Sequence, residues 1–162
     1  MSITLREVTL DDASLLNTWK HDPYLIKHAL EFDYNTSLEQ QQEDIKRALG
    51  DHDQDYRIIL SDQTPIGYIR INFIDPHHKV AWLRFALGEQ RGQGFSKLAL
   101  QLLMQDLIKK GIHRVEAEVY QHNRASIKTL ERLNFFKEGT KRQAHYNGEK
   151  WIDVHVFGWV KP

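Results

Sequence analysis

The spacing of apolar residues along the chain predicts alternating strands and helices. Residues 3–8 alternate between apolar and polar, which is typical of a short strand, and the acidic residues 11–12 offer an N-cap to a following helix. Ser37 and Gln40 have the spacing of a capping box, so a second helix is expected to end near Gly50. The polar turns that follow separate three expected strands, over residues 56–60, 66–74 and 80–87.

The segment from residue 80 to residue 120 has the most informative pattern. The apolar strand over residues 80–87 is followed by a glycine turn at residues 91–96, after which apolar residues recur at helical spacing. Gly111 ends this helix, and residues 114–120 read as another strand. The two strands should be parallel, with the helix as their crossover connection. This crossover should be right-handed, because a helix that returns over a twisted sheet packs against it with only that handedness.

The C-terminal part predicts a short helix and a hairpin. The helix is expected over residues 123–133, and long alternating runs over 135–146 and 149–160 flank Asn147-Gly148. Asn-Gly between such runs indicates a β-hairpin with a two-residue turn, which places Arg142 opposite Asp153 as a supporting cross-strand pair. We find no repeat and no linker, so a single domain over residues 1–162 is expected.

Composition removes several classes of function. The 162 residues include 22 Lys plus Arg and 22 Asp plus Glu, and this zero net charge argues against nonspecific nucleic-acid binding. The absence of cysteine excludes disulfides, a thiolate nucleophile and sulfur-ligated metals. No leader pattern and no long apolar run is present, so we expect a cytoplasmic protein with no membrane partner. The nine histidines show no metal-binding spacing, and His77-His78 lies in a polar turn, so no metal is expected.

The glycine turn is the clearest candidate for ligand binding. Gly92 and Gly94 would let a ligand approach the backbone closely, and the helix that follows would offer unpaired amides with a partial positive charge. A pyrophosphate is the natural ligand there, with Arg91 as a possible partner, although a turn that binds nothing explains two glycines equally well. A dinucleotide-binding oxidoreductase is disfavoured, because Lys97 replaces the third glycine of that fingerprint and the pattern holds only one strand–helix–strand unit.

A series of short motifs, in order, resembles the GCN5-related N-acetyltransferases, and within them the group that acetylates ribosomal-protein N-termini and similar amines. The acetyl-CoA motif of that family is Gln or Arg, two residues, Gly, one residue, then Gly or Ala. Residues 91–96 match it except for Ser96 in the last position. Further matches, spanning nearly the whole chain, are Leu5-Arg6, Gly67, Gly111 to Val115, Asn123 to Ser126, Leu133 to Phe135, Glu138-Gly139, and Tyr146 to Gly148 with Asp153.

The resemblance implies an α/β (α+β) fold with a mixed, mostly antiparallel sheet flanked by helices. In that fold the strand over residues 80–87 splays from the strand over 114–120, and the pantetheine arm of acetyl-CoA enters the gap. Asn123 matches an asparagine that touches this arm, and it could equally be a helix N-cap. The predicted residues for binding coenzyme A are Phe85, Ala86, Leu87, Arg91, Gly92, Gln93, Gly94, Phe95, Ser96, Asn123 and Ser126.

Four residues are candidates for the chemistry. In this family the amine attacks the thioester directly within a ternary complex, which suits a chain without cysteine. Ser126 falls where close relatives carry a serine near the thioester sulfur, so it is expected to donate a hydrogen bond to the leaving thiolate, unless it is an ordinary exposed serine. His145 stands where relatives carry a glutamate and is the expected base, with a plain surface histidine as the alternative. Glu116 and Glu118 are rival bases acting through water.

Fewer residues bear on the amine acceptor and on the oligomeric state. The aromatic and acidic stretch from Trp19 to Tyr34, with Asp22, Glu31 and Asp33, lies where the family builds its acceptor site, and its acids would attract a cationic amine. We therefore expect acetyl-CoA-dependent acetylation of a primary amine: a peptide N-terminus, polyamine, aminoglycoside or amino sugar. A noncatalytic acyl-CoA-binding or regulatory module is the alternative, because Leu130 occupies the position of the usual catalytic tyrosine. A monomer or homodimer is expected, with Trp151 and Trp159 as core or interface anchors.

Overall fold

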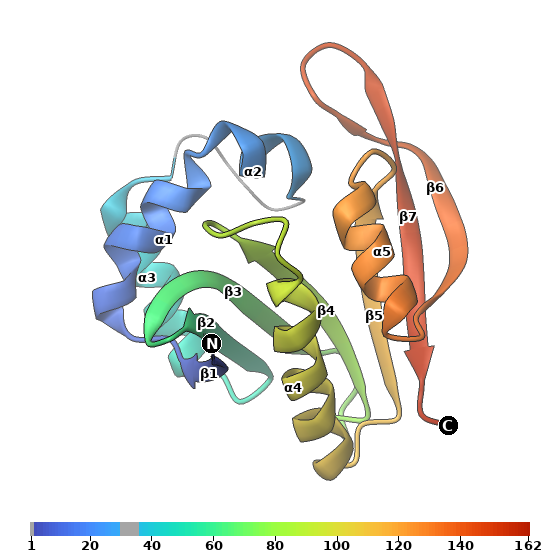
Figure 1. Ribbon diagram of the computed structural model, residues 1–162, viewed down its shortest axis with the longest axis horizontal. Coiled ribbons are helices and arrows are strands. Elements are labelled where there is room, and N and C mark those ends of the chain that lie inside the picture. Colours follow the sequence, from blue (N-terminus) through green and yellow to red (C-terminus); the bar gives the residue numbers. More distant parts are fainter. Residues whose placement is uncertain (1, 30–35) are drawn as a thin grey trace.

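The computed structural model describes residues 2–29 and 36–162 of the chain. Within these residues, seven strands form one sheet in the order β1-β2-β3-β4-β5-β7-β6 (Figure 1). Every neighbouring pair is antiparallel except β4 and β5, which are parallel, so the expected mixed, mostly antiparallel sheet is confirmed. The strands are β1 (Ile3–Glu7), β2 (Gln54–Ser61), β3 (Thr64–Phe73), β4 (Val80–Leu87), β5 (Arg114–Tyr120), β6 (Phe136–Tyr146) and β7 (Trp151–Val160).

Helices cover both faces of the sheet (Figure 1). They are the 3-10 turn η1 (Leu10–Asp12), α1 (Ala13–Lys20), α2 (Pro23–His28), α3 (Leu38–Leu49), α4 (Phe95–Lys109) and α5 (Arg124–Arg132). The capping box expected at the start of α3 is present: the Gln40 amide donates to Ser37 Oγ at 3.1 Å, and the Ser37 amide donates to Gln40 Oε1 at 2.9 Å. None of the described helices is long and apolar enough to cross a membrane.

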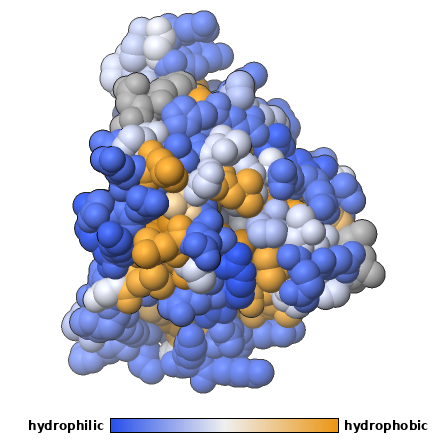
Figure 2. All heavy atoms as spheres, turned by 90° about the vertical axis from the view of Figure 1, so that its left-hand side faces the viewer, coloured by the Kyte–Doolittle hydropathy of each residue, from blue (hydrophilic) through white to orange (hydrophobic). Residues whose placement is uncertain are grey.

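The period-two alternation of the strands divides the core into two layers. Leu83 and Val115 face α4 and pack with Leu103, whereas Ile58 faces the opposite side and packs with Ile45 of α3. All five side chains are at most 2% exposed. The outer surface over α1 and α3 is mostly hydrophilic, with separate apolar spots between polar residues (Figure 2). The sheet is thus fixed between two buried apolar layers, which give the loops at its ends a rigid support.

The C-terminal hairpin departs from the expectation of a two-residue turn. The loop contains residues 147–150, because Asn147 Oδ1 accepts hydrogen bonds from the Glu149 and Lys150 amides, each at 2.9 Å. The strands regain the expected register only at Lys141, after a bulge over residues 142–144.

The expected cross-strand pair of Arg142 and Asp153 is therefore wrong. Arg142 lies within the bulge, and Asp153 Oδ1 instead accepts the Gln143 amide at 2.8 Å, which holds the bulge in place. Of the two tryptophans of β7, Trp159 is 6% exposed and belongs to the core, whereas Trp151 is 58% exposed and packs on Tyr146 near the hairpin loop.

Candidate active site

The parallel strands β4 and β5 separate halfway along their length. Their register runs from Val80 opposite Arg114 to Leu83 opposite Ala117 and then stops, although both strands continue. Beyond Leu83, β4 is paired only with β3, up to Leu87. The splayed pair expected from the resemblance is confirmed, and it opens a gap at the C-terminal ends of the two strands.

Backbone groups of β4 point into this gap. The Gly88 amide donates to the Ile66 carbonyl at 2.8 Å, and the Ile74 amide donates to the Val80 carbonyl at 3.0 Å. Because pairing alternates along an antiparallel ladder, the even-numbered residues of β4 bond to β3 and the odd-numbered ones face β5. The amide and carbonyl of Phe85 and the amide of Leu87 therefore face the gap, whereas those of Ala86 face β3.

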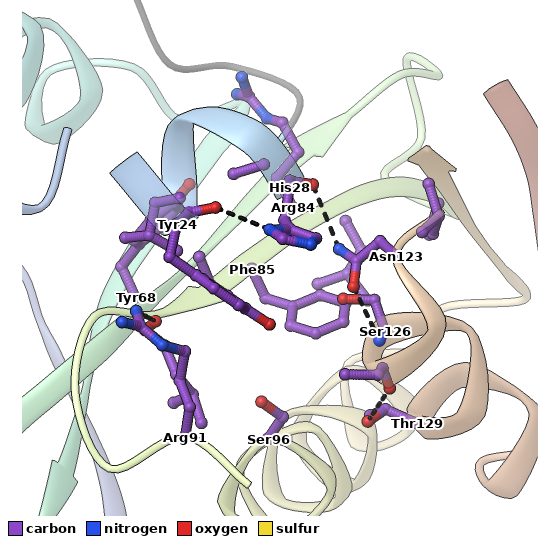
Figure 3. Close-up of a pocket in the computed structure, with 18 of the residues that line it drawn as sticks. Tyr24, His28, Tyr68, Arg84, Phe85, Arg91, Ser96, Asn123, Ser126 and Thr129 are labelled. Carbon is purple, nitrogen blue, oxygen red and sulfur yellow. Dashed lines mark hydrogen bonds between the residues drawn. The ribbon is translucent and has the colours of Figure 1, made fainter. Parts of the chain in front are cut away.

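A cavity of about 340 Å³ lies at the gap and is lined by residues of α2, β4, β5 and the first turns of α4 and α5 (Figure 3). It brings together many of the residues proposed from the sequence. Those lining it are Phe85, Ala86, Leu87, Arg91, Gly92, Ser96, Glu118, Asn123 and Ser126. Those that do not line it are Gln93, Gly94, Phe95, Glu116 and His145.

The glycine turn joins this cavity to the start of α4. Gly92 and Gly94 have φ of 81° and 80°, in the left-handed region that favours glycine, and a Cβ on either would meet no protein atom within 4 Å. Gly94 is the N-cap of α4, and no side chain caps this helix, unlike α3 and α5. Phe95 is 5% exposed and anchors the turn in the core. The first amides of α4 are thus presented beside open space, as an anion requires.

Arg91 ties the glycine turn to α2. Its Nη1 donates to the Leu87 carbonyl at 2.9 Å and to the Gly88 carbonyl at 3.2 Å, and its Nη2 donates to Asp22 Oδ2 at 3.3 Å. The guanidinium also lies 4.2 Å from the centre of the Tyr24 ring. These contacts hold the cavity wall together, and they occupy the guanidinium that the sequence offered as a partner for phosphate.

The first turn of α5 forms the opposite wall. Asn123 is its N-cap: Oδ1 accepts the Ser126 amide at 3.2 Å, and Nδ2 donates to the His28 carbonyl at 3.2 Å (Figure 3). Ser126 lines the cavity from this turn. Leu130, at the position of the usual tyrosine, is completely buried in the core below it.

Two cavity residues on α2, Tyr24 and His28, lie in the stretch expected to form the acceptor site but were not named as site residues from the sequence. Their rings stack at 4.2 Å, and the Tyr24 hydroxyl points into the cavity (Figure 3). His28 Nδ1 lies 2.8 Å from the Tyr24 carbonyl oxygen, which can only accept a hydrogen bond. Nδ1 therefore carries the proton, and Nε2 of the neutral ring keeps a lone pair. Asp22-Pro23, an N-cap followed by proline, was the available signal for a helix here.

The three proposed bases differ in position. Glu118 lines the cavity and forms an ion pair with Lys141, whereas Glu116 accepts from Arg114 Nε at 3.0 Å, outside it. His145 stacks on Tyr120 at 4.7 Å.

His145 is connected to the cavity by a row of rings. Tyr120 stacks on His122 at 5.5 Å, and His122 meets His28 edge-on at 5.3 Å. Of the acidic acceptor residues expected from the sequence, Asp22 caps α2, and Glu31 and Asp33 lie outside the described residues.

Known proteins share both the sequence pattern and this architecture. Residues 2–135 match the family model of the acetyltransferase (GNAT) domain. A relative from Bacillus licheniformis, an uncharacterized N-acetyltransferase named p20, is 30% identical over 98% of this chain and 93% of its own length.

Solved structures share the fold. The ribosomal L7/L12 alpha-N-protein acetyltransferase RimL in complex with coenzyme A superposes with a TM-score of 0.89 at 24% identity, covering 99% of this chain and 94% of that one. Spermidine N-acetyltransferase from Vibrio cholerae, in complex with coenzyme A and spermine, gives a TM-score of 0.89 at 16% identity over 98% and 95% of the two chains. This chain therefore belongs to the GNAT family of acetyltransferases.

Proposed function

We propose that this acetyltransferase transfers an acetyl group from acetyl-CoA to a primary amine by direct attack within a ternary complex. The observation that carries the proposal is the continuity between two features. The gap between β4 and β5 opens into the same cavity that the uncapped N-terminus of α4 borders. A ligand with an anionic end and an amide-containing arm fits this combination, and coenzyme A has both.

The cosubstrate would lie across these two features. Its pyrophosphate accepts hydrogen bonds from the amides at the start of α4, where the helix dipole favours negative charge. Its pantetheine arm adds to the open side of β4, and its amides bond to the backbone of Phe85 and Leu87 as a further strand would. The thioester would then lie near Ser126, which lines the same cavity from the first turn of α5.

The transfer then requires that the amine and the thioester are held close together and that one base accepts the amine proton. The amine nitrogen forms a bond to the thioester carbon, the carbon–sulfur bond breaks, and the amine proton passes to a base while the thiolate leaves. We propose that His28 Nε2 accepts this proton, because Nδ1 is already occupied by the Tyr24 carbonyl and the ring lines the cavity. Ser126 would donate a hydrogen bond to the departing sulfur. His145, Glu116 and Glu118 remain the alternatives for the base.

The described lining of the cavity offers little negative charge to an acceptor, because Arg84 and Arg91 line it together with Glu118. Glu118 is the one carboxylate among the described residues that line the cavity, and Lys141 neutralises it. Asp22, beside the cavity, pairs with Arg91. A polyamine carries several charges that need unpaired carboxylates, so these pairs support a peptide N-terminus or a small monoamine.

A thiol-release assay tests the proposal. Acetyl-CoA is incubated with the protein and a panel of N-terminal peptides, small monoamines, spermidine and aminoglycosides, and the products are checked for one added acetyl group by mass spectrometry. We expect release with a peptide or monoamine and little with spermidine. Tight binding of acetyl-CoA without release for any amine would contradict the proposal and support the noncatalytic acyl-CoA-binding module.

A further inference from the structure

The structure brings the neighbouring residues His52 and Asp53 together with His78, which is 25 residues further along the chain, at the end of the sheet opposite the cavity. His52 and Asp53 lie between α3 and β2, and His78 lies in the turn between β3 and β4. One ligand atom from each of these three side chains lies within 4.8 Å of the other two. His78 Nε2 is 2.7 Å from Asp53 Oδ1, and His52 Nε2 is 3.4 Å from the same oxygen.

Two of the three side chains are held in place by their surroundings. The turn that carries His78 is fixed by Asp75, whose carboxylate accepts the amides of His77, Lys79 and Val80. The His78 ring lies flat on Phe73, with ring centres 4.4 Å apart and planes 6° apart.

Asp53 is held through its backbone. Its amide donates to Asp51 Oδ1 at 2.9 Å, and its carbonyl accepts the Phe73 amide at 2.9 Å. The His52 side chain is the most exposed of the three, at 87%.

Two imidazoles and one carboxylate are ligands suited to Zn²⁺ and similar divalent transition metals. A tetrahedral Zn²⁺ with bonds of about 2.0–2.1 Å separates its ligand atoms by roughly 3.3 Å. The distance from His52 to Asp53 already matches, and the distance from His78 to Asp53 must open by roughly 0.6 Å. Among the described residues, no lysine or arginine pairs with Asp53, so its charge is available to a cation.

We propose that His52, Asp53 and His78 form a binding site for a divalent transition metal, with Zn²⁺ as the best fit and water completing the coordination. A bound ion would join the segment before β2 to the turn before β4. Because the transferring groups meet at the other end of these strands, the ion takes no part in acetyl transfer and instead stabilises the fold when bound.

Metal titration of tag-free protein tests the site. Zn²⁺ is titrated in competition with a chromogenic chelator, and Co²⁺ is used as a probe because its visible absorption reports tetrahedral coordination. We expect one ion per chain, and a loss of affinity of about tenfold or more in His78→Asn and Asp53→Asn. Asparagine suits the left-handed backbone of His78, whose φ is 53°, so the first variant should fold.

The neighbouring His77 supplies the matched control. His77→Ala removes an exposed imidazole one residue away and should keep the affinity of the wild type. Zn²⁺ should raise the unfolding temperature of the wild type and of His77→Ala, and leave that of His78→Asn unchanged. Equal affinity in the wild type and His78→Asn, no stoichiometric uptake by the wild type, or an equal loss in His77→Ala would each overturn the proposed ligand set.

Discussion

Replacing Gly94 by alanine should weaken coenzyme A binding through the backbone of the glycine turn. Gly94 has φ of 80°, and a residue with a Cβ pays roughly 1–2 kcal/mol to stay in that left-handed conformation. A turn that relaxes to avoid this strain moves the first amides of α4 away from the phosphate, and binding must restore them. A penalty of 1–2 kcal/mol corresponds to a Kd about 5- to 30-fold higher, to be measured by titration calorimetry with coenzyme A.

Gly148→Ala is the matched control, because Gly148 has φ of 97°, also faces open space, and lies in the β6–β7 hairpin away from the cavity. Gly148→Ala should lose up to roughly 1–2 kcal/mol of unfolding free energy, which lowers Tm by up to about 2–8 °C for a chain of this size. Gly94→Ala should lose less, because its relaxed turn meets the strain only when coenzyme A binds. Only Gly94→Ala should lose affinity. An unchanged Kd in a folded Gly94→Ala protein would refute the placement of the pyrophosphate on this turn.

Three further outcomes are expected. Ser126→Ala should lower kcat by roughly tenfold and leave the Kd of acetyl-CoA unchanged, because the hydroxyl acts on the leaving sulfur; full activity in steady-state kinetics would remove that role. With a fixed amine at one pH, His28→Ala should lower kcat/KM by roughly 100-fold or more and His145→Ala should leave it nearly unchanged; the reverse would make His145 the base. Burial acts to raise the pKa of Asp44, but the hydrogen bonds and charge of Arg70, together with the charges of Lys20 and Arg47, outweigh it, so the pKa is lowered. Because the pKa of the folded state is depressed, the ionised Asp44 stabilises the fold above the ordinary carboxyl range, and this stabilisation is lost on acidification. Asp44→Asn should therefore cost about 1–3 kcal/mol of unfolding free energy at pH 7 and flatten its decrease between about pH 5 and pH 3, as measured by urea unfolding. An unchanged acid dependence would contradict this.

Local signals in the sequence were sufficient for the elements that position the site. The Ser37–Gln40 capping box, the glycine turn and the helical spacing after it depend on neighbouring residues, and each predicted its element. The crossover between β4 and β5 follows from the handedness of such units. The order of family motifs then placed the gap between these strands, which the register confirms.

Features that depend on distant contacts could not be predicted in this way. The shift of the β6–β7 register follows from hydrogen bonds that Asn147 and Asp153 make to backbone amides, and no pattern of apolar residues encodes them. Arg91 is bound by Asp22, 69 residues away. The stretch after Trp19 lacks periodicity, so α2 was not predicted and His28 was not recognised as a cavity residue.

The most direct test of the account is a crystal structure with coenzyme A bound. We predict that the pyrophosphate contacts the amides at the start of α4, that the pantetheine arm lies between β4 and β5 with hydrogen bonds to the Phe85 backbone, and that the sulfur ends near Ser126. Coenzyme A bound elsewhere, with the gap beyond Leu83 unoccupied, would contradict the central claim that the splay of these two strands forms the cosubstrate site.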